Sequence, residues 1–529
     1  MSRQDAVSGT MGGGESWRPS HNPWIIAISV MLATFMEVLD TSVANVALPH
    51  IAGSLSAGLD ESTWVLTSYL VANAIVLPST GWLGRTFGRK RFLILCIGIF
   101  TIASALCGAA TSLGMLVVAR VAQGVGGGAL QPIAQAVMLE SFPPRQRGAA
   151  MAVYGMGVVV APIIGPTLGG WITDQYSWRW VFYINLPVGV LAVFMARIFV
   201  EDPPYVRFAR RTRLDYVGFA LMAVGLGVLQ VVLDKGQRED WFASSWIRYM
   251  ATLSAVSLVV FVIWELWVRE PIVDLRVFRN RNFAMGTCMI GLVGVVLYGT
   301  TALLPLFLQT LLGYPALQSG LAVSPRGIGS LLSMIIVGRI VGFLDNRWLL
   351  AGGFALLGYS VYRFAGINLQ IAMVNIVWPN ILIGFALGFV FVPLTTLTLG
   401  RLGNEQMGNA TGLYNLMRNL GGGFGIATVT TLLSRGSQAY QAILSSHTNV
   451  YNPEFQDRYQ QIVAALTPKV GEAGAKQQAY GLIYQEVTRQ AGLLAYVHDF
   501  EVLAVVCLLC APVAFAFLRI THKPEVAAH

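Results

Sequence analysis

The sequence contains fourteen apolar runs, each about long enough to cross a lipid bilayer as a helix. A span needs about 20 mostly apolar residues, because the hydrocarbon core is about 30 Å thick. In lipid, only helices and closed barrels satisfy all of their backbone polar groups, so runs of this length predict an all-α membrane protein. The predicted spans are residues 25–48, 63–83, 92–110, 114–138, 149–171, 180–199, 216–233, 247–267, 284–308, 317–338, 349–366, 373–399, 410–433 and 494–519.

Composition agrees with a multi-pass membrane protein and argues against several other classes. Hydrophobic residues make up 55% of the 529 residues and charged residues only 12%, whereas soluble domains carry about 25% charged residues. The formal net charge of +9 could indicate a nucleic-acid partner. The basic residues lie in short loops between spans, however, so we expect a lipid bilayer and no nucleic acid. The five cysteines fall inside spans and the six histidines do not cluster, so no metal, cofactor or enzyme site is predicted.

The distribution of basic residues predicts the orientation. Lysines and arginines concentrate in the loops that follow even-numbered spans, as in Arg89, Lys90 and Arg91 after the second span. Cytoplasmic loops of membrane proteins carry such an excess. We therefore expect both termini in the cytoplasm. The first run is span-length and lacks a cleavage site, so we interpret it as a retained helix rather than a signal peptide.

A faint internal repeat predicts two six-helix halves separated by two inserted helices. The fifth helix of each half is glycine-rich, in APIIGPTLGG (residues 161–170) and NLGGGFGIA (residues 419–427). Many secondary transporters are built from paired halves around a central site. The predicted organisation is a tail at 1–24, a first half at 25–199, a linker with two inserted helices at 200–267, a second half at 268–519, and a tail at 520–529.

A long polar segment, residues 434–493, interrupts the second half on the predicted external side. It is rich in Gln and Ala, and residues 454–466 and 473–489 could be helical. A loop of this length usually has a function. Two interpretations stay open, a solvated cap over the molecule or a docking surface for another protein.

Two carboxylates lie in the middle of the first span. Ala33, Glu37, Asp40 and Ala44 follow one another at steps of four, three and four, which puts both acids on one helical face between small residues. An acid at membrane depth costs roughly 2.5–3.5 kcal/mol on insertion scales, so a functional role is the default reading. We expect Asp40 to carry protons and Glu37 to be a second candidate. The alternative is a structural hydrogen bond to a neighbouring helix.

Three arginines lie more than five residues inside predicted spans. Arg120 in the fourth span needs a partner because arginine stays charged in proteins, and an acid of the first span is one candidate. The alternative is a side chain that extends to the membrane surface. Arg326 and Arg418 lie in the second half. Together with Asn45 and Gln123 they are our candidates for a substrate cavity, so that proton chemistry would lie in the first half and more of the substrate surface in the second.

Glycine and proline mark two further candidate elements. In the fifth span they suggest a hinge or seal, with tight static packing as the alternative. After the second span, glycines permit a tight turn, and the cations could either bind neighbouring helix ends or only anchor the loop. These gating and packing candidates are Pro162, Gly165, Pro166, Gly169 and Gly170, and Gly81, Gly84, Gly88 and Arg89.

Several of these strings resemble motifs of the major facilitator superfamily, and specifically of its fourteen-span drug:proton antiporters of the EmrB type. LDTSVANVALP (residues 39–49) resembles the first-helix motif of that branch, and GWLGRTFGRKR (residues 81–91) the superfamily loop motif. Arg120 with its neighbours resembles the fourth-helix motif, and APIIGPTLGG the antiporter motif of the fifth helix. The loop motif normally has an acid where this chain has Arg85.

The resemblance implies an expected function. It predicts the major facilitator fold and export of hydrophobic toxic drugs in exchange for protons, by alternating access, from a bacterial inner membrane. It also implies a periplasmic membrane-fusion adaptor and an outer-membrane channel, with the segment before the last span as a contact. An importer of nutrients or metabolites on the same fold, by uniport or proton symport, is the alternative, which the fifth-helix motif disfavours. No P-loop is present, so no ATP site is expected.

Overall fold

The computed structural model describes residues 19–143, 146–203, 215–449 and 451–518, and within these ranges all regular structure is helical. Most of the predicted tails at 1–24 and 520–529 lies outside the described residues. The α-helices are α1 (Pro23–Ser54), α2 (Leu59–Ser62), α3 (Trp64–Phe87), α4 (Arg89–Gly108), α5 (Leu113–Gly127), α6 (Leu130–Ser141), α7 (Arg147–Gln175), α8 (Trp180–Tyr183), α9 (Asn185–Phe199), α11 (Tyr216–Lys235), α12 (Ser245–Trp267), α13 (Arg281–Thr310), α14 (Ala316–Val323), α15 (Pro325–Ile340), α16 (Asn346–Tyr362), α17 (Met373–Leu399), α18 (Met407–Ser446) and α19 (Pro453–Val513). Short 3-10 helices are η2 (Trp241–Ala243), η3 (Leu275–Arg279), η4 (Arg363–Gly366), η5 (Asn404–Gln406) and η6 (Ala514–Ala516).

The helices lie where the apolar runs predicted them, which confirms the all-α membrane architecture. The fourth, sixth and tenth spans each consist of two consecutive helices, α5 with α6, α8 with α9, and α14 with α15. Within the described chain, 11 helical segments are long and apolar enough to cross a membrane. The other predicted spans coincide with α16, which has only 17 residues, and with the more polar α3 and α18.

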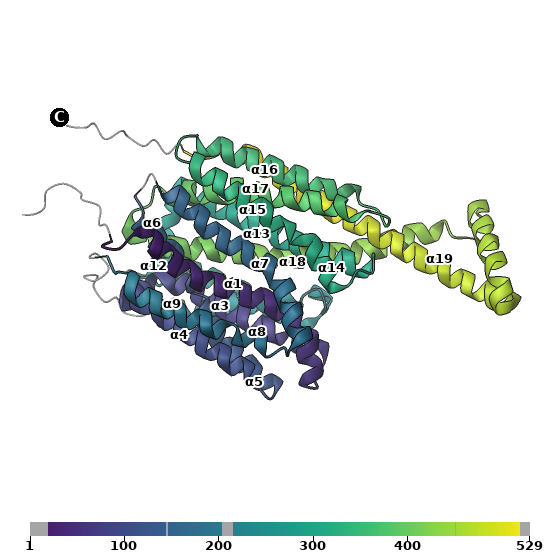
Figure 1. The fold of residues 1–529 in the computed structure, drawn as a ribbon, viewed down its shortest axis with the longest axis horizontal. Coiled ribbons are helices and arrows are strands. Elements are labelled where there is room, and N and C mark those ends of the chain that lie inside the picture. The colour runs from purple at the N-terminus through teal and green to yellow at the C-terminus, as the bar shows by residue number, and fades with distance from the viewer. Residues whose placement is uncertain (1–18, 144–145, 204–214, 450, 519–529) are drawn as a thin grey trace, which may run out of the picture.

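The helices form two groups (Figure 1). Helices α1 to α9 pack on one another through pairs such as α1 with α7 and α4 with α9, and α13 to α19 do so through pairs such as α13 with α18 and α16 with α19. Helices α11 and α12 pack together, and α11 contacts both α3 and α18. The groups meet where α7 contacts α15 and α17, and where α18 contacts α3 and α6. The residue boundaries of the two halves stay predictions.

The beginning of α1 and the end of α19 lie at the same end of the molecule, which we call the terminal end (Figure 1). Near the start of α1, the His21 ring is 2.6 Å from a carboxylate oxygen of Glu201, just after α9. Beyond the end of α19, Leu518 and Asn282 exchange hydrogen bonds of 2.9 and 3.1 Å. Because Asn282 lies in the first turn of α13, both groups of helices begin at this end.

The segment between the last two predicted spans, residues 434–493, is mostly helical, and the expected helical pieces at 454–466 and 473–489 lie within α19. Helix α18 continues to Ser446, and α19 starts at Pro453, with Asn452 accepting a hydrogen bond from the backbone of Glu454 at 3.0 Å. Both helices leave the bundle at the end opposite the terminal end (Figure 1). We call residues 434–493 the projection.

The tip of the projection is held by a kink and by aromatic contacts. Gly471 interrupts α19 with a φ of 76°, a left-handed conformation that glycine adopts without strain. The kink brings the ring of Tyr480 to 4.7 Å from that of Tyr459, which also stacks on Phe455. Gln- and Ala-rich segments can form helices while remaining polar, which fits the helical pieces expected in this segment.

Helices α1 and α7 approach closely at the glycine–proline motif. A Cβ atom on Gly165 would collide with Ser42, and one on Gly169 would lie 2.9 Å from Val43. Pro166 has no backbone N–H, so the carbonyl of Pro162 loses its helical partner. The Ser42 hydroxyl donates to that carbonyl at 3.2 Å. Proline in this span is therefore compensated by the helix it packs against.

Gly170 does not take part in this contact, because a Cβ there would meet no atom within 4 Å. We therefore expect Gly165→Leu to lower the melting temperature of the purified protein, by the equivalent of about 1–3 kcal/mol for an overpacked contact. Gly170→Leu is the matched control and should melt like the wild type. An equal loss in both variants would show that close packing of α1 on α7 is not what the glycines provide.

Candidate functional site

Asp40 is buried at the middle of α1, where its carboxylate receives three side-chain donors. Its Oδ2 atom is 2.6 Å from Nη1 of Arg120 in α5. Its Oδ1 atom accepts from Nε2 of Gln123 at 2.9 Å and from Nδ2 of Asn185 at 2.7 Å. Both members of the ion pair have fully buried side chains. A buried ion pair is tolerated when further hydrogen bonds satisfy the remaining polar atoms, and the two amides supply them here.

Arg120 points into the bundle, so the alternative of a side chain that extends to the membrane surface is wrong. Its Nε donates to the backbone carbonyl of Val65 at 3.0 Å, and its Nη1 also donates to Oε1 of Gln123 at 2.8 Å. The guanidinium lies 4.3 Å from the centre of the Tyr69 ring. These contacts with residues of α3 and α5 hold the guanidinium of Arg120 beside Asp40.

Glu37 lies one turn before Asp40 and has a different set of partners. Its Oε1 accepts from the Tyr69 hydroxyl at 3.0 Å and from Nδ2 of Asn73 at 3.3 Å. Its Oε2 accepts from Nε2 of Gln131 in α6 at 2.6 Å. Its direct partners are therefore neutral donors, whereas Asp40 has a cation. The two acids share a helical face, as predicted, but they form separate clusters joined by Tyr69.

A glycine-rich interruption of the helix between α5 and α6 positions the side-chain amides that donate hydrogen bonds to the two acids. A Cβ on Gly126 would lie 2.6 Å from the backbone nitrogen of Phe100, and one on Gly128 would lie 2.7 Å from the carbonyl of Asn73. Only glycine lets the chain approach α3 and α4 this closely. The break separates Gln123, which binds Asp40, from Gln131, which binds Glu37.

Arg418 connects the second group of helices to this site. Its Nη2 donates to Oε1 of Gln131, whose amide nitrogen donates to Glu37. The side chain is 2% exposed, and its Nε and Nη1 have no hydrogen-bond partner among the described residues. Arg418 lies about three turns into α18, which begins at Met407.

The four candidates for a substrate cavity do not come together. Arg326 lies in α15 and donates to Thr301 at 2.9 Å and to Asn380 at 3.1 Å, all within the second group of helices. Asn45 is exposed on α1, and Gln123 belongs to the Asp40 cluster. These residues and Arg418 lie on different helices with separate partners, and their role in a substrate cavity stays a prediction.

The glycine-rich turn between α3 and α4 binds neighbouring elements at the terminal end. Gly88 has a φ of 82°, and two residues later the backbone N–H of Lys90 donates to Asp202 at 2.8 Å. Arg89 forms a buried ion pair with Glu140 at the end of α6. A Cβ on Gly81 would lie 2.7 Å from the backbone of Asn409 in α18, whereas Gly84 makes only an ordinary contact.

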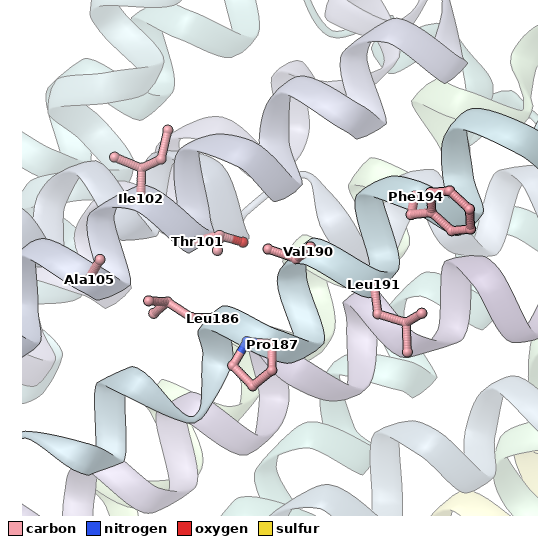
Figure 2. Close-up of a pocket in the computed structure, with 8 residues that line it drawn as sticks. All are labelled: Thr101, Ile102, Ala105, Leu186, Pro187, Val190, Leu191 and Phe194. Atoms are coloured by element: carbon pink, nitrogen blue, oxygen red, sulfur yellow. The ribbon is translucent and has the colours of Figure 1, made fainter.

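A groove of about 690 Å³ runs between α4 and α9. Figure 2 shows its lining, which is apolar apart from the hydroxyl of Thr101. The opposite side of the same pair of helices carries Ser104 and Asn185, hydrogen-bonded at 3.0 Å beside Asp40. The groove contains none of the predicted site residues, and its lining is Thr101, Ile102, Ala105, Leu186, Pro187, Val190, Leu191 and Phe194.

Sequence reasoning missed the neutral partners of the two acids. A signal was available, because each is a polar residue inside an apolar span. It also missed Asp499, which is buried in α19 with both carboxylate oxygens unpartnered among the described residues. The missed partners are Tyr69, Asn73, Gln131 and Asn185.

The sequence is similar to a family model and to named export and resistance proteins. Residues 30–426 match the sequence model of the Major Facilitator Superfamily. The chain is 39% identical over 476 residues to the multidrug export protein EmrB of Escherichia coli K12, covering 89% of this chain and 90% of EmrB. It is 37% identical over 490 residues to the fatty acid resistance protein FarB of Neisseria gonorrhoeae, covering 93% of this chain and 95% of FarB.

Solved structures share the fold at low sequence identity. The human organic anion transporter MFSD10 superposes with a TM-score of 0.57 at 13% identity, covering 92% of this chain and all of the transporter. The proton:xylose symporter XylE also gives a TM-score of 0.57, at 12% identity, covering 90% of this chain and 94% of XylE. At such identities the likeness concerns the arrangement of helices alone.

The ion pair of Asp40 and Arg120 leads to a stability prediction. Arg120→Met leaves a buried carboxylate without its cation and should destabilise the purified protein by about 3–5 kcal/mol. The double variant Asp40→Asn with Arg120→Met should recover much of that loss, because neutral Asn needs no counter-ion. Thermal unfolding in detergent measures both. A double variant no more stable than Arg120→Met would contradict this account of the pair.

Proposed function

Because this chain belongs to the major facilitator superfamily and, within it, to the EmrB-type multidrug exporters, we propose that it is a proton-coupled multidrug efflux antiporter. One observation carries the coupling to protons. Two carboxylates lie at membrane depth in α1, and both are enclosed by donors that stabilise their ionised forms. A titratable group held in this way can gain and lose a proton as its surroundings change.

Asp40 is the principal proton carrier in this proposal. In its ionised form, Asp40 accepts hydrogen bonds from Arg120 and Gln123 of α5 and from Asn185 of α9. Protonation would remove the charge that offsets Arg120, so the cation would have to find water or another acceptor. A change of proton occupancy at Asp40 is thereby converted into a change in how α1 packs on its neighbours. Glu37 is the second titratable position.

The proton gradient is sufficient to drive export. One proton moving inward across about 100 mV releases about 2.3 kcal/mol. Since about 1.4 kcal/mol corresponds to a tenfold ratio, one proton sustains roughly a fiftyfold gradient of a neutral substrate. The expected substrates are hydrophobic toxic compounds, in keeping with the names of EmrB and FarB.

Alternating access would move substrate between the two groups of helices. We place the terminal end in the cytoplasm of a bacterial inner membrane, following the predicted excess of basic residues in the loops on that side. At this end the close approach of Gly81 to Asn409 supports a state closed toward the cytoplasm. The glycine–proline contact of α7 with α1 is then a site where the first half could flex.

The projection would serve a tripartite assembly. It leaves the bundle at the end opposite the terminal end (Figure 1), which is the periplasmic side in this orientation. A helical arm of this kind suits contact with a periplasmic membrane-fusion adaptor, which would continue the path to an outer-membrane channel.

Transport by purified protein tests the coupling. In proteoliposomes with an imposed pH gradient, the wild type should move a lipophilic dye against the direction of proton flow, and an uncoupler should stop it. Asp40→Asn cannot ionise and should abolish proton-driven movement, a loss of at least about a hundredfold. Gly170→Leu, whose side chain enters open space, is the control for incorporation. Dye that moves in the same direction as protons would support the importer instead.

Removal of the projection tests the tripartite assembly. The side chains of Gln441 in α18 and Tyr484 in α19 are hydrogen-bonded at 3.3 Å, so residues 442–483 can be replaced by a short glycine–serine linker without separating the helices. The shortened protein should transport normally in proteoliposomes but fail to protect cells from drugs. Full protection of cells by the shortened protein would count against an adaptor contact on the projection.

A further inference from the structure

The structure joins Glu37 to the opposite half of the molecule through a single amide, and we propose that Gln131 is a proton-sensitive latch that holds the two halves closed while Glu37 is ionised. This inference rests on the proposed function, and it assigns to Gln131 a positioning role in coupling. Gln131 donates to Glu37 at 2.6 Å through Nε2 and accepts from Arg418 through Oε1.

The latch is the innermost of three contacts that α18 makes with α3 and α6. Nearest the terminal end, Gly81 of α3 approaches Asn409 of α18. Further inward, Nδ2 of Asn415 donates to Oε1 of Gln135 at 2.7 Å. Deeper still, Gln131 meets Arg418, one helical turn along α6. These three contacts form a seam that closes the molecule between Glu37 and the terminal end.

Only the innermost of these three contacts includes a charged group and leads to an acid. The orientation of the Gln131 amide is fixed, because Arg418 can only donate and an ionised Glu37 can only accept. The bond to an ionised acceptor is about twice as strong as a neutral one, and successive hydrogen bonds polarise one another. The ionised state of Glu37 therefore strengthens the hold of Gln131 on Arg418.

Protonation of Glu37 would leave Arg418 in an unfavourable position. Arg418 is 2% exposed, and its Nε and Nη1 atoms have no hydrogen-bond partner among the described residues. A buried cation is tolerated near a negative charge and is costly without one. When Glu37 becomes neutral, opening the seam to water satisfies these N–H groups. Proton binding thus favours opening toward the terminal end, as an antiporter that takes protons from the outside requires.

Other titratable and charged groups surround Glu37, and none replaces the latch. Tyr69 of α3 donates to its carboxylate, and Tyr154 of α7 lies nearby with its hydroxyl 3.4 Å from the Gln131 carbonyl. Asp40 on the same helix is neutralised by Arg120 of α5. The charge of Arg418 in α18 is the one that reaches Glu37 across the seam.

Spin labels on both halves at the terminal end can measure the seam directly. Phe87 at the end of α3 and Phe343 after α15 are 51% and 89% exposed, so each accepts a label once the exposed Cys288 is replaced by serine. Double electron–electron resonance on the full-length protein in lipid nanodiscs reports the closed and open populations. From about pH 8 to about pH 5, the closed-to-open ratio of the wild type should fall about tenfold, equivalent to about 1.4 kcal/mol.

Variants of the seam separate the latch from ordinary packing. Gln131→Met keeps the side-chain length but cannot bridge, so the pH response of the seam should be lost. Glu37→Gln should be open at every pH. Gln135→Met is the matched control, because it removes the neutral contact with Asn415 one turn away and should change the closed-to-open ratio without moving its pH midpoint. A wild-type pH response in Gln131→Met would overturn the latch.

Asp40→Asn distinguishes this inference from the proposed function. It should stop proton-driven transport in proteoliposomes and yet keep the pH response of the seam. If the response disappears in Asp40→Asn and persists in Glu37→Gln, the switch belongs to Asp40 and the latch is wrong. If the wild type exchanges dye for protons but its closed-to-open ratio does not change with pH, the latch is wrong and the proposed transport function stands. Absence of any proton-driven transport would remove the proposed function itself.

Discussion

A charge taken out of water must be given donors or an opposite charge, and the centre of this molecule is arranged around that requirement. The carboxylates of Asp40 and Glu37 lie where a bilayer offers neither. The protein supplies a guanidinium and two amides to Asp40, and a phenol and two amides to Glu37. Neither acid can change its proton occupancy without altering contacts that run to other helices.

This requirement accounts for local features that propensity alone would disfavour. The glycines between α5 and α6 break a span at membrane depth, yet the break is enclosed by α3 and α4, where irregular backbone is tolerated. It brings Gln123 to one acid and Gln131 to the other. Pro166 frees a carbonyl in α7 that Ser42 of α1 then satisfies. Both irregularities lie beside α1, the helix that carries the acids.

The two acids differ in what they connect, and this difference suggests a division of labour. Asp40 binds groups of α5 and α9, so its protonation would act within the first half. Glu37 reaches the second half through Gln131 and Arg418. In the proposed antiporter, proton binding in one half must be joined to movement between the halves, and the Glu37 cluster would provide a physical connection for that step.

The sequence by itself determined the class of fold, because apolar length is a local property that a bilayer translates directly into helical spans. It also located Asp40, Glu37 and Arg120, since a charge inside an apolar run stands out without any knowledge of neighbours. The tertiary structure decided which groups meet. Helix packing made partners of residues far apart in sequence, such as Asn185 with Asp40 and Gln131 with Arg418, and it separated Asn45 and Arg326 from the acids. Neutral amides stand out as polar residues in apolar spans, but their roles depend on which helix face lies opposite, and only packing fixes that.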